Sequence, residues 1–257
     1  MRERQPNLNL LFAEPARVVA ELATLIASAP MLSLAPRGDR HPVLVMPGFG
    51  AGDRSTQVLR GYLGSLGYRT NPWNLGRNLG PAMPDLLPAL TARLDEVFAA
   101  GGERKVSLIG WSLGGVYARL LAHLEPHKVR QVITLGSPFA GLRSGSIDTG
   151  AARSRSHLGS LVSQALPGIP SSAVFSRSDV IVPWHIATQT ESAIAENIEV
   201  FASHIALGFS PAVLYACADR LAQADGSWRA FEVKGWKQSV FGPANLHMEP
   251  AAGRAAV

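Results

Sequence analysis

The chain has 257 residues, of which 47% are hydrophobic and 17% charged, so it is long enough for one α/β domain with a substantial buried core. Polar or turn residues interrupt every apolar segment before bilayer length, so no transmembrane helix or stable membrane insertion is expected. The 24 basic residues outnumber the 19 acidic ones but are dispersed, and no basic motif with interleaved aromatics predicts a nucleic-acid partner.

The single cysteine and the N-terminal segment limit the kinds of site and the location that the sequence predicts. Cys217 is the single cysteine, which excludes an internal disulfide and a cysteine-based metal site and favours a buried, small apolar side chain. The segment MRERQPNLNLLFAEPARVV has a short, interrupted apolar run without a cleavage pattern, so a cytoplasmic location is expected.

Apolar periodicity predicts alternating helices and strands along the chain. Helices are predicted over 15–28, 55–67, 83–102, 113–126, 157–166 and 210–224, and strands over 43–46, 68–73, 105–110, 129–136, 172–176 and 197–202. Strands separated by helices of this length pair in parallel, so we expect a single domain with a doubly wound, mostly parallel sheet and a core over about residues 41–225.

Two segments depart from this alternation. Residues 138–170 are rich in Gly, Ser and Arg, and a long, weakly structured insertion of this kind predicts a lid over a site; the alternative is a surface excursion without a role. The C-terminal extension, residues 226–257, carries Trp228, Phe231, Trp236 and Phe241, which predicts that part of it packs on the domain.

The most informative motif is Gly110-Trp111-Ser112-Leu113-Gly114, at the junction of a predicted strand and a predicted helix. A sharp turn there places the serine in a strained backbone conformation, and the small residues two before and two after it, Gly110 and Gly114, relieve crowding between strand and helix. The helix N-terminus points its positive end at the site. This strand, turn and helix resemble the nucleophile elbow of the α/β-hydrolase superfamily, in particular its bacterial lipase and esterase members.

The resemblance implies an acid and a histidine that follow Ser112 in that order. Asp179 in SRSDVIVP, just beyond a predicted strand, resembles the acid loop; Asp148, in the predicted lid, is the competitor. His204 in ASHIALGFSP resembles the histidine loop and follows another strand, whereas His185 lies close behind Asp179 and His247 lies in the tail.

The resemblance also implies an oxyanion hole made of two backbone N–H groups. Leu113 supplies one, and Phe49 in VLVMPGFGAGD supplies the other, because this loop resembles the His-Gly loop of lipases. Pro47 stands where many relatives have histidine, which puts the bracing of the loop in question. Arg77 in WNLGRNLGP either lines the site or braces it, with bracing favoured, and Trp111, Phe139 and Trp184 are candidate substrate-lining residues.

These residues and motifs predict a carboxylic ester hydrolase that forms an acyl-enzyme and needs no cofactor and no metal. The apolar neighbours of the motifs favour small-molecule or lipid esters with a hydrophobic part. A protein that acts on lipid esters would also contact a lipid surface. Two alternatives stay open: an acyltransferase or perhydrolase with the same three residues, and a non-catalytic binding protein of the same fold. The sequence does not predict the oligomeric state or the particular ester.

Overall fold

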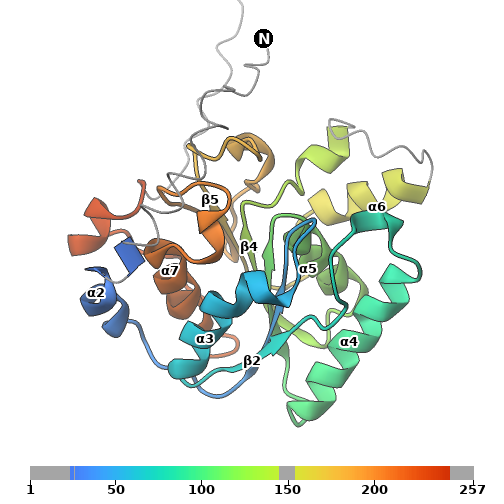
Figure 1. Ribbon diagram of the computed structural model, residues 1–257, viewed down its shortest axis with the longest axis horizontal. Helices are drawn as coiled ribbons and strands as arrows, with labels where there is room; N and C mark the ends of the chain where they lie inside the picture. Colours follow the sequence, from blue (N-terminus) through green and yellow to red (C-terminus); the bar gives the residue numbers. More distant parts are fainter. Residues whose placement is uncertain (1–23, 26, 145–153, 244–257) are drawn as a thin grey trace, which may run out of the picture.

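The computed structural model describes residues 24–25, 27–144 and 154–243 (Figure 1). At its centre lies a sheet of six parallel strands in the order β2-β1-β3-β4-β5-β6. The strands are β1 (Pro42–Met46), β2 (Arg69–Pro72), β3 (Val106–Trp111), β4 (Val129–Leu135), β5 (Ser171–Phe175) and β6 (Ala195–Glu199). The parallel sheet predicted from the alternation of elements is confirmed.

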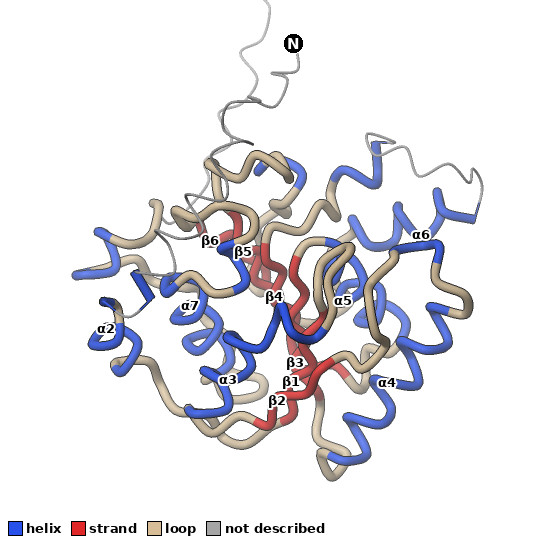
Figure 2. The backbone as a smooth tube through the Cα atoms, in the orientation of Figure 1, coloured by secondary structure: helices blue, strands red, loops and turns tan. Residues whose placement is uncertain are grey.

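Helices cover both faces of the sheet, as a doubly wound fold requires. One face carries α2 (Ala29–Ser33), α3 (Gln57–Ser65) and α7 (Pro211–Leu221), and the other carries α4 (Leu86–Ala100), α5 (Leu113–Leu124) and α6 (Ser154–Ser163) (Figure 2). The short helix α2 was not predicted. Helix α4 ends at Gly101, where the sequence placed its stop signal.

Alternate residues of the strands face the two helical layers. In β1, Val43 and Val45 pack with Leu63 of α3, whereas Leu44 and Met46 pack with α4 and α5 on the other side. All of β1 is therefore buried, which is why the strand is a continuous apolar run rather than an alternating one.

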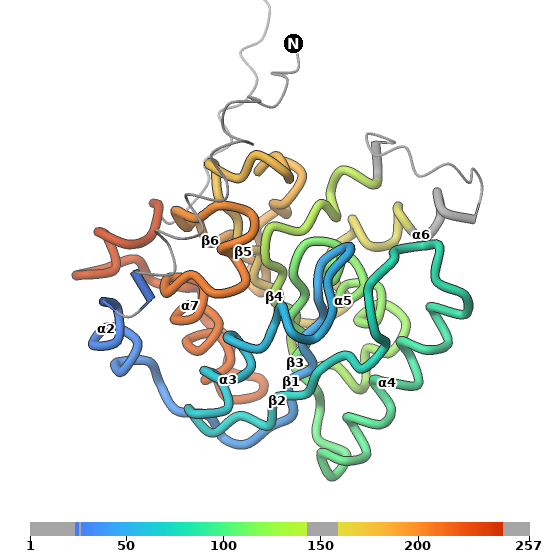
Figure 3. Tube along the Cα trace, viewed as in Figure 1, coloured from blue at the N-terminus to red at the C-terminus, as the bar shows by residue number. Residues whose placement is uncertain are grey.

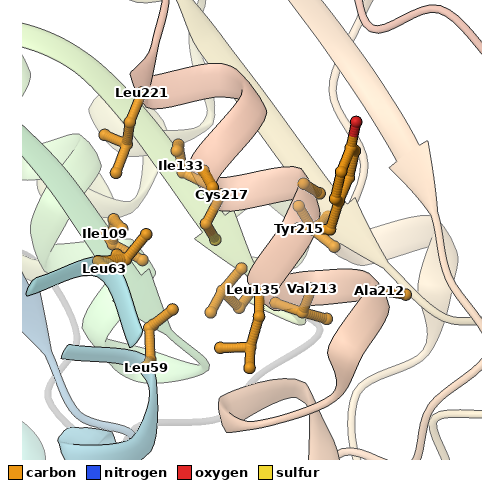
Figure 4. Packing of buried hydrophobic residues seen from close by; sticks show 14 of the residues in the cluster. Leu59, Leu63, Ile109, Ile133, Leu135, Ala212, Val213, Tyr215, Cys217 and Leu221 are labelled. Carbon is orange, nitrogen blue, oxygen red and sulfur yellow. The ribbon is translucent and has the colours of Figure 1, made fainter. Parts of the chain in front are cut away.

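Cys217 lies in the core between α7 and the sheet. Figure 4 shows it beside Ile133 and Leu221, and its side chain is fully buried. Burial in this apolar cluster raises the pKa of the Cys217 thiol to about 12, so the group stays a neutral thiol at neutral pH. The interpretation of Cys217 as a small buried apolar residue agrees with this placement.

The described part of the segment predicted as a lid is a crossover between β4 and β5. It contains a 3-10 turn (Gly141–Ser144) and α6, which packs against α5. The buried Arg119 of α5 donates to the carbonyl oxygens of Val162 (2.6 Å) and Gln164 (2.5 Å), and so fixes the C-terminal end of α6. Residues 145–153 and Asp148 lie outside the described residues, and the lid stays a prediction.

The two ends of the chain are described in part. Most of the helix predicted over 15–28 lies outside the described residues. In the C-terminal extension, Phe231 and Phe241 are buried and contact each other edge to face with their ring centroids 4.8 Å apart, and Phe241 forms a β-bridge with Val200. This part of the extension completes the core over α7, as the aromatic content predicted.

The strand order places a topological switch point between β1 and β3 at the carboxyl edge of the sheet. Strands β1 and β3 are neighbours, but the chain leaves β1 toward α3 on one face and leaves β3 toward α5 on the other. Loops that diverge from adjacent strands in this way leave room for a ligand between them. The site should therefore lie where β1 and β3 end.

Candidate active site

Ser112 occupies the sharp turn between β3 and α5. Its backbone has φ 53° and ψ −122°, a conformation that non-glycine residues rarely adopt and that a surrounding structure must hold in place. The Ser112 N–H donates to the carbonyl oxygen of Leu135 at the end of β4 (2.8 Å), and its carbonyl oxygen accepts from the Gly115 N–H (3.0 Å). These bonds fix the half-buried serine at the N-terminus of α5, where the helix dipole is positive.

Three glycines allow the turn to form, each for a different reason. A Cβ on Gly110 would lie 2.3 Å from the Gly114 carbonyl oxygen, so this glycine lets α5 start directly over its own strand. A Cβ on Gly114 would lie 2.4 Å from the Met46 carbonyl oxygen, so it admits the loop after β1. A Cβ on Gly115 would lie 2.5 Å from Ser137 Oγ, and this position was not predicted although a Gly-Gly pair marks it.

Asp179 and His204 form a buried hydrogen-bonded pair. Asp179 follows β5 and His204 follows β6, and Asp179 Oδ2 lies 2.6 Å from His204 Nδ1. The other carboxylate oxygen, Oδ1, accepts from the N–H groups of Ile181 (2.9 Å) and Val182 (2.8 Å). When Asp179 is a carboxylate and His204 a neutral imidazole, this hydrogen bond requires the imidazole proton on Nδ1 and leaves Nε2 as an acceptor.

This pair lies beside the end of β4 and β3, next to the serine turn. A Cβ on Gly136, the residue after Leu135, would lie 3.1 Å from Asp179 Oδ2 and 3.4 Å from His204 Nδ1. Trp111, the neighbour of Ser112, donates from its indole Nε1 to the carbonyl oxygen of His204 (3.1 Å). The structure thus gathers the three predicted residues at one edge of the sheet, from three different strands.

The loop after β1 lies against the serine turn. Figure 3 shows this blue segment beside the green α5, and a Cβ on Gly48 would lie 3.2 Å from Ser112 Cβ and 3.8 Å from its Oγ. The Ala51 N–H donates to the Gly48 carbonyl oxygen (3.2 Å) and Gly50 has φ +74°, the pattern of a tight turn with glycine at its third position. Phe49 is 68% exposed, and its ring lies against Gly80.

The other predicted site residues have different environments. Arg77 donates from Nε to the carbonyl oxygen of Gly50 (2.6 Å), which is the bracing role that the sequence favoured. Trp184 is partly exposed and stacks under the guanidinium of Arg177, 4.2 Å from its ring centroid. Phe139 is fully buried beneath Arg119, 4.2 Å from its ring centroid, so the expectation that it lines a substrate site is corrected.

The competing histidines do not replace His204 at Asp179. His185 is exposed and contacts Trp184 edge to face, and His247 lies outside the described residues. A second hydrogen-bonded set of the same residue types, Asp39, His41 and Ser107, lies at the opposite end of the sheet. There both His41 and Ser107 are 0% exposed, and burial lowers the pKa of His41 to about 4, so its imidazole is uncharged at neutral pH. Asp39 also pairs with Arg104 and Arg130, so this set is a structural cluster whose histidine and serine no substrate reaches.

Comparison with known proteins places the fold. No family model matches the chain. A solved structure of PytH, a pyrethroid hydrolase, superposes with a TM-score of 0.50 at 17% identity, over 70% of this chain and 96% of that chain. The chain has the α/β-hydrolase fold. The Ser112 turn and the loops that carry Asp179 and His204 all lie at the carboxyl edge of the parallel sheet.

Sequence relatives cover a smaller part of the protein. The chain is similar to triacylglycerol lipases of Pseudarthrobacter phenanthrenivorans and Burkholderia plantarii, each 32% identical over 109 residues. The match takes in 40% of this chain and 34% and 30% of these relatives, so it spans about a third of their length.

The described part of the chain offers neither a metal site nor a membrane span. Within residues 24–25, 27–144 and 154–243, no group of three or more His, Cys, Asp or Glu side chains could hold a metal ion. Over the same residues, no helix has the length and apolar content needed to cross a bilayer.

Proposed function

We propose that this α/β-hydrolase is a serine carboxylic ester hydrolase that works through Ser112, His204 and Asp179. The observation that carries the proposal is the buried Asp179–His204 pair, 2.6 Å between Oδ2 and Nδ1, set beside a serine held at φ 53°. The imidazole presents an unprotonated Nε2, and the serine lies at a helix N-terminus, which is the arrangement that activates a hydroxyl nucleophile.

The proposed reaction has two acyl-transfer steps. Ser112 Oγ attacks the ester carbonyl carbon while His204 Nε2 takes the hydroxyl proton, and Asp179 stabilises the imidazolium that forms. The N–H groups of Phe49 and Leu113 bind the negative oxygen of the tetrahedral intermediate. The C–O bond to the alcohol then breaks, the alcohol leaves with the proton from Nε2, and water repeats the sequence on the acyl-enzyme to release the acid and free Ser112.

The rim of the site supports an ester with a hydrophobic part. Large apolar side chains are exposed on the loops that follow the strands: Phe49 after β1, Leu79 after β2, Ile181 after β5, and Phe201 and Ile205 after β6. Exposed apolar residues gathered at one edge indicate contact with apolar ligands rather than with charged ones. The triacylglycerol lipases that match part of the chain act on such esters, and the same rim would face a lipid surface that presents one.

The proposal is tested with p-nitrophenyl esters from acetate to palmitate. We expect the unmodified protein to hydrolyse them, and Ser112→Ala to lose at least about 10³-fold in kcat, because the nucleophile is gone while binding is kept. His204→Ala should lose activity to a similar degree, whereas the exposed His185→Ala serves as the matched control and should keep it. Hydrolysis by Ser112→Ala at the unmodified rate would overturn the proposal, and equal loss in both histidine variants would overturn the assignment of the base.

A further inference from the structure

The loop that carries the Phe49 N–H is held from one side by a single buried residue, Asn78. Asn78 lies in the segment after β2 and is 0% exposed. Its side-chain Nδ2 donates to the carbonyl oxygen of Pro47 (2.8 Å), and its own carbonyl oxygen accepts from the Gly50 N–H (2.7 Å). Its N–H donates to the carbonyl oxygen of Ala51 (2.8 Å). One residue thus contacts the loop at three successive points.

These contacts fall on the peptide groups that flank the Phe49 N–H. The Pro47 carbonyl belongs to the peptide group before Gly48, and the Gly50 N–H belongs to the peptide group after Phe49. Peptide groups are planar, so fixing both neighbours leaves the Gly48–Phe49 peptide group little freedom to rotate. Its carbonyl oxygen accepts from Ala51 (3.2 Å), and its N–H has no assigned partner among the described residues. The Phe49 N–H is therefore fixed in direction and remains available as a donor.

The side-chain oxygen of Asn78 connects the same loop to the helix that follows Ser112. Asn78 Oδ1 accepts from the Gly80 N–H (3.0 Å) and lies 3.5 Å from the hydroxyl of Tyr117 on α5. Burial raises the pKa of the Tyr117 hydroxyl above its usual range, so it remains protonated and available as a donor. Helix α5 begins with Leu113, the other proposed oxyanion donor, so Asn78 lies between the two halves of the hole.

No other uncharged side chain of this size provides the same set of hydrogen bonds. The site needs a donor toward Pro47 and an acceptor toward Gly80, 2.8 Å and 3.0 Å away, and the primary amide supplies both from one planar group. Pro47 itself has no N–H and no polar side-chain atom with which to brace the loop. Asn78 therefore supplies the bracing that the sequence left in question at Pro47.

We propose that Asn78 is a positioning residue for the oxyanion hole, which sets the direction of the Phe49 N–H and its spacing from the Leu113 N–H. The inference rests on the proposed function, because an oxyanion hole matters only if Ser112 is acylated. A positioning residue of this kind acts on the transition state more than on substrate binding, since the negative oxygen develops after the substrate is bound. Loss of its bonds should therefore change kcat and leave KM nearly unchanged.

Asn78→Asp is the most selective test, because it keeps the acceptor toward Gly80 and replaces the donor toward Pro47 by a carboxylate oxygen. We expect kcat to fall about 10- to 100-fold with KM within about threefold of the unmodified value, since a misplacement of about 1 Å has effects of that order. The inhibition constant of an alkylboronic acid, whose boron-bound oxygen would occupy the oxyanion hole, should rise by the same factor as kcat falls.

Asn197→Asp is the matched control. The Asn197 amide also donates to a backbone carbonyl oxygen, that of Gln189 (2.8 Å), and accepts from a backbone N–H, that of Gln189 (2.9 Å), but it lies on β6 away from the Phe49 loop. It should lower stability without changing kcat per folded molecule. If the buried carboxylate of Asn78→Asp prevents folding, Asn78→Ser carries the test, because it removes the donor without adding a charge, and the same loss of kcat is expected.

The outcomes separate this inference from the proposed function. If Ser112→Ala is inactive and folded Asn78→Asp and Asn78→Ser both keep kcat within twofold, the positioning role is wrong and the proposed function stands. An equal fall of kcat in Asn197→Asp would also overturn the role, because the effect would then be a general loss of stability. If Ser112→Ala hydrolyses the ester as the unmodified protein does, the proposed function itself fails.

Discussion

Replacing Asp179 by asparagine is expected to lower kcat for ester hydrolysis about 10⁴-fold while the protein stays folded. Asp179 Oδ1 receives two backbone N–H groups, from Ile181 and Val182. In Asp179→Asn the amide oxygen must take that position, because an NH₂ group there would face two donors. The NH₂ group then points at His204 Nδ1 and forces the imidazole proton onto Nε2. The base of the proposed reaction would carry its proton on the wrong nitrogen.

Two measurements check this expectation. Steady-state kinetics of the variant give the loss in kcat, and the ¹⁵N chemical shifts of the His204 ring report which nitrogen is protonated. Asp219→Asn is the control, because Asp219 is a partly buried carboxylate on α7 whose partners are Arg220 and Lys237, remote from the site. A kcat within tenfold of the unmodified protein, or a ring that still carries its proton on Nδ1, would contradict the role given to Asp179.

The second large effect is expected from Gly110→Ala, which should lower the free energy of unfolding by about 3 kcal/mol or more. The added Cβ would lie 2.3 Å from the Gly114 carbonyl oxygen, the Gly115 Cα and the Gly115 N. All three are backbone atoms of α5, so no side chain can rotate away to make room. Relief requires the helix to move off β3, which would also displace Ser112.

Gly61→Ala is the matched control for this substitution. Gly61 lies inside α3 and a Cβ there would meet nothing within 4 Å, so alanine should raise the free energy of unfolding by about 0.5–1 kcal/mol through its higher helix propensity. Urea denaturation followed by circular dichroism measures both variants. If Gly110→Ala unfolded within about 1 kcal/mol of the unmodified protein, the close approach of α5 to β3 described above would be wrong.

The sequence predicts the strands and helices of the sheet well because apolar periodicity and turn residues are local signals. Apolar strands such as Val43–Met46 and helices that stop at glycine, as at Gly101, follow from periodicity and turn chemistry without knowledge of distant contacts. Ser112, Asp179 and His204 could be named together because each lies just after a predicted strand, and parallel strands end at a common edge.

The remaining errors concern contacts between distant segments. Phe139 follows a strand near the site, but its burial depends on Arg119, a residue of another element that no local pattern connects to it. The proposed positioning role of Asn78 depends on hydrogen bonds to a loop about thirty residues earlier in the chain. The glycine-punctuated segment around Asn78 gives no specific sequence signal for these bonds. The crossover helix α6 was predicted from its local pattern, and the lid around it stays a prediction.

The most direct test of the account is covalent labelling of the unmodified protein with an alkyl fluorophosphonate, followed by mass spectrometry. Attack of Ser112 Oγ on phosphorus would form an O–P bond and release fluoride, so we expect one phosphonyl group per chain, on the peptide that contains Ser112. Labelling should be absent in Ser112→Ala and strongly slowed in His204→Ala. A label on any other residue, or equal labelling of Ser112→Ala, would contradict the claim that Ser112 is the nucleophile of this protein.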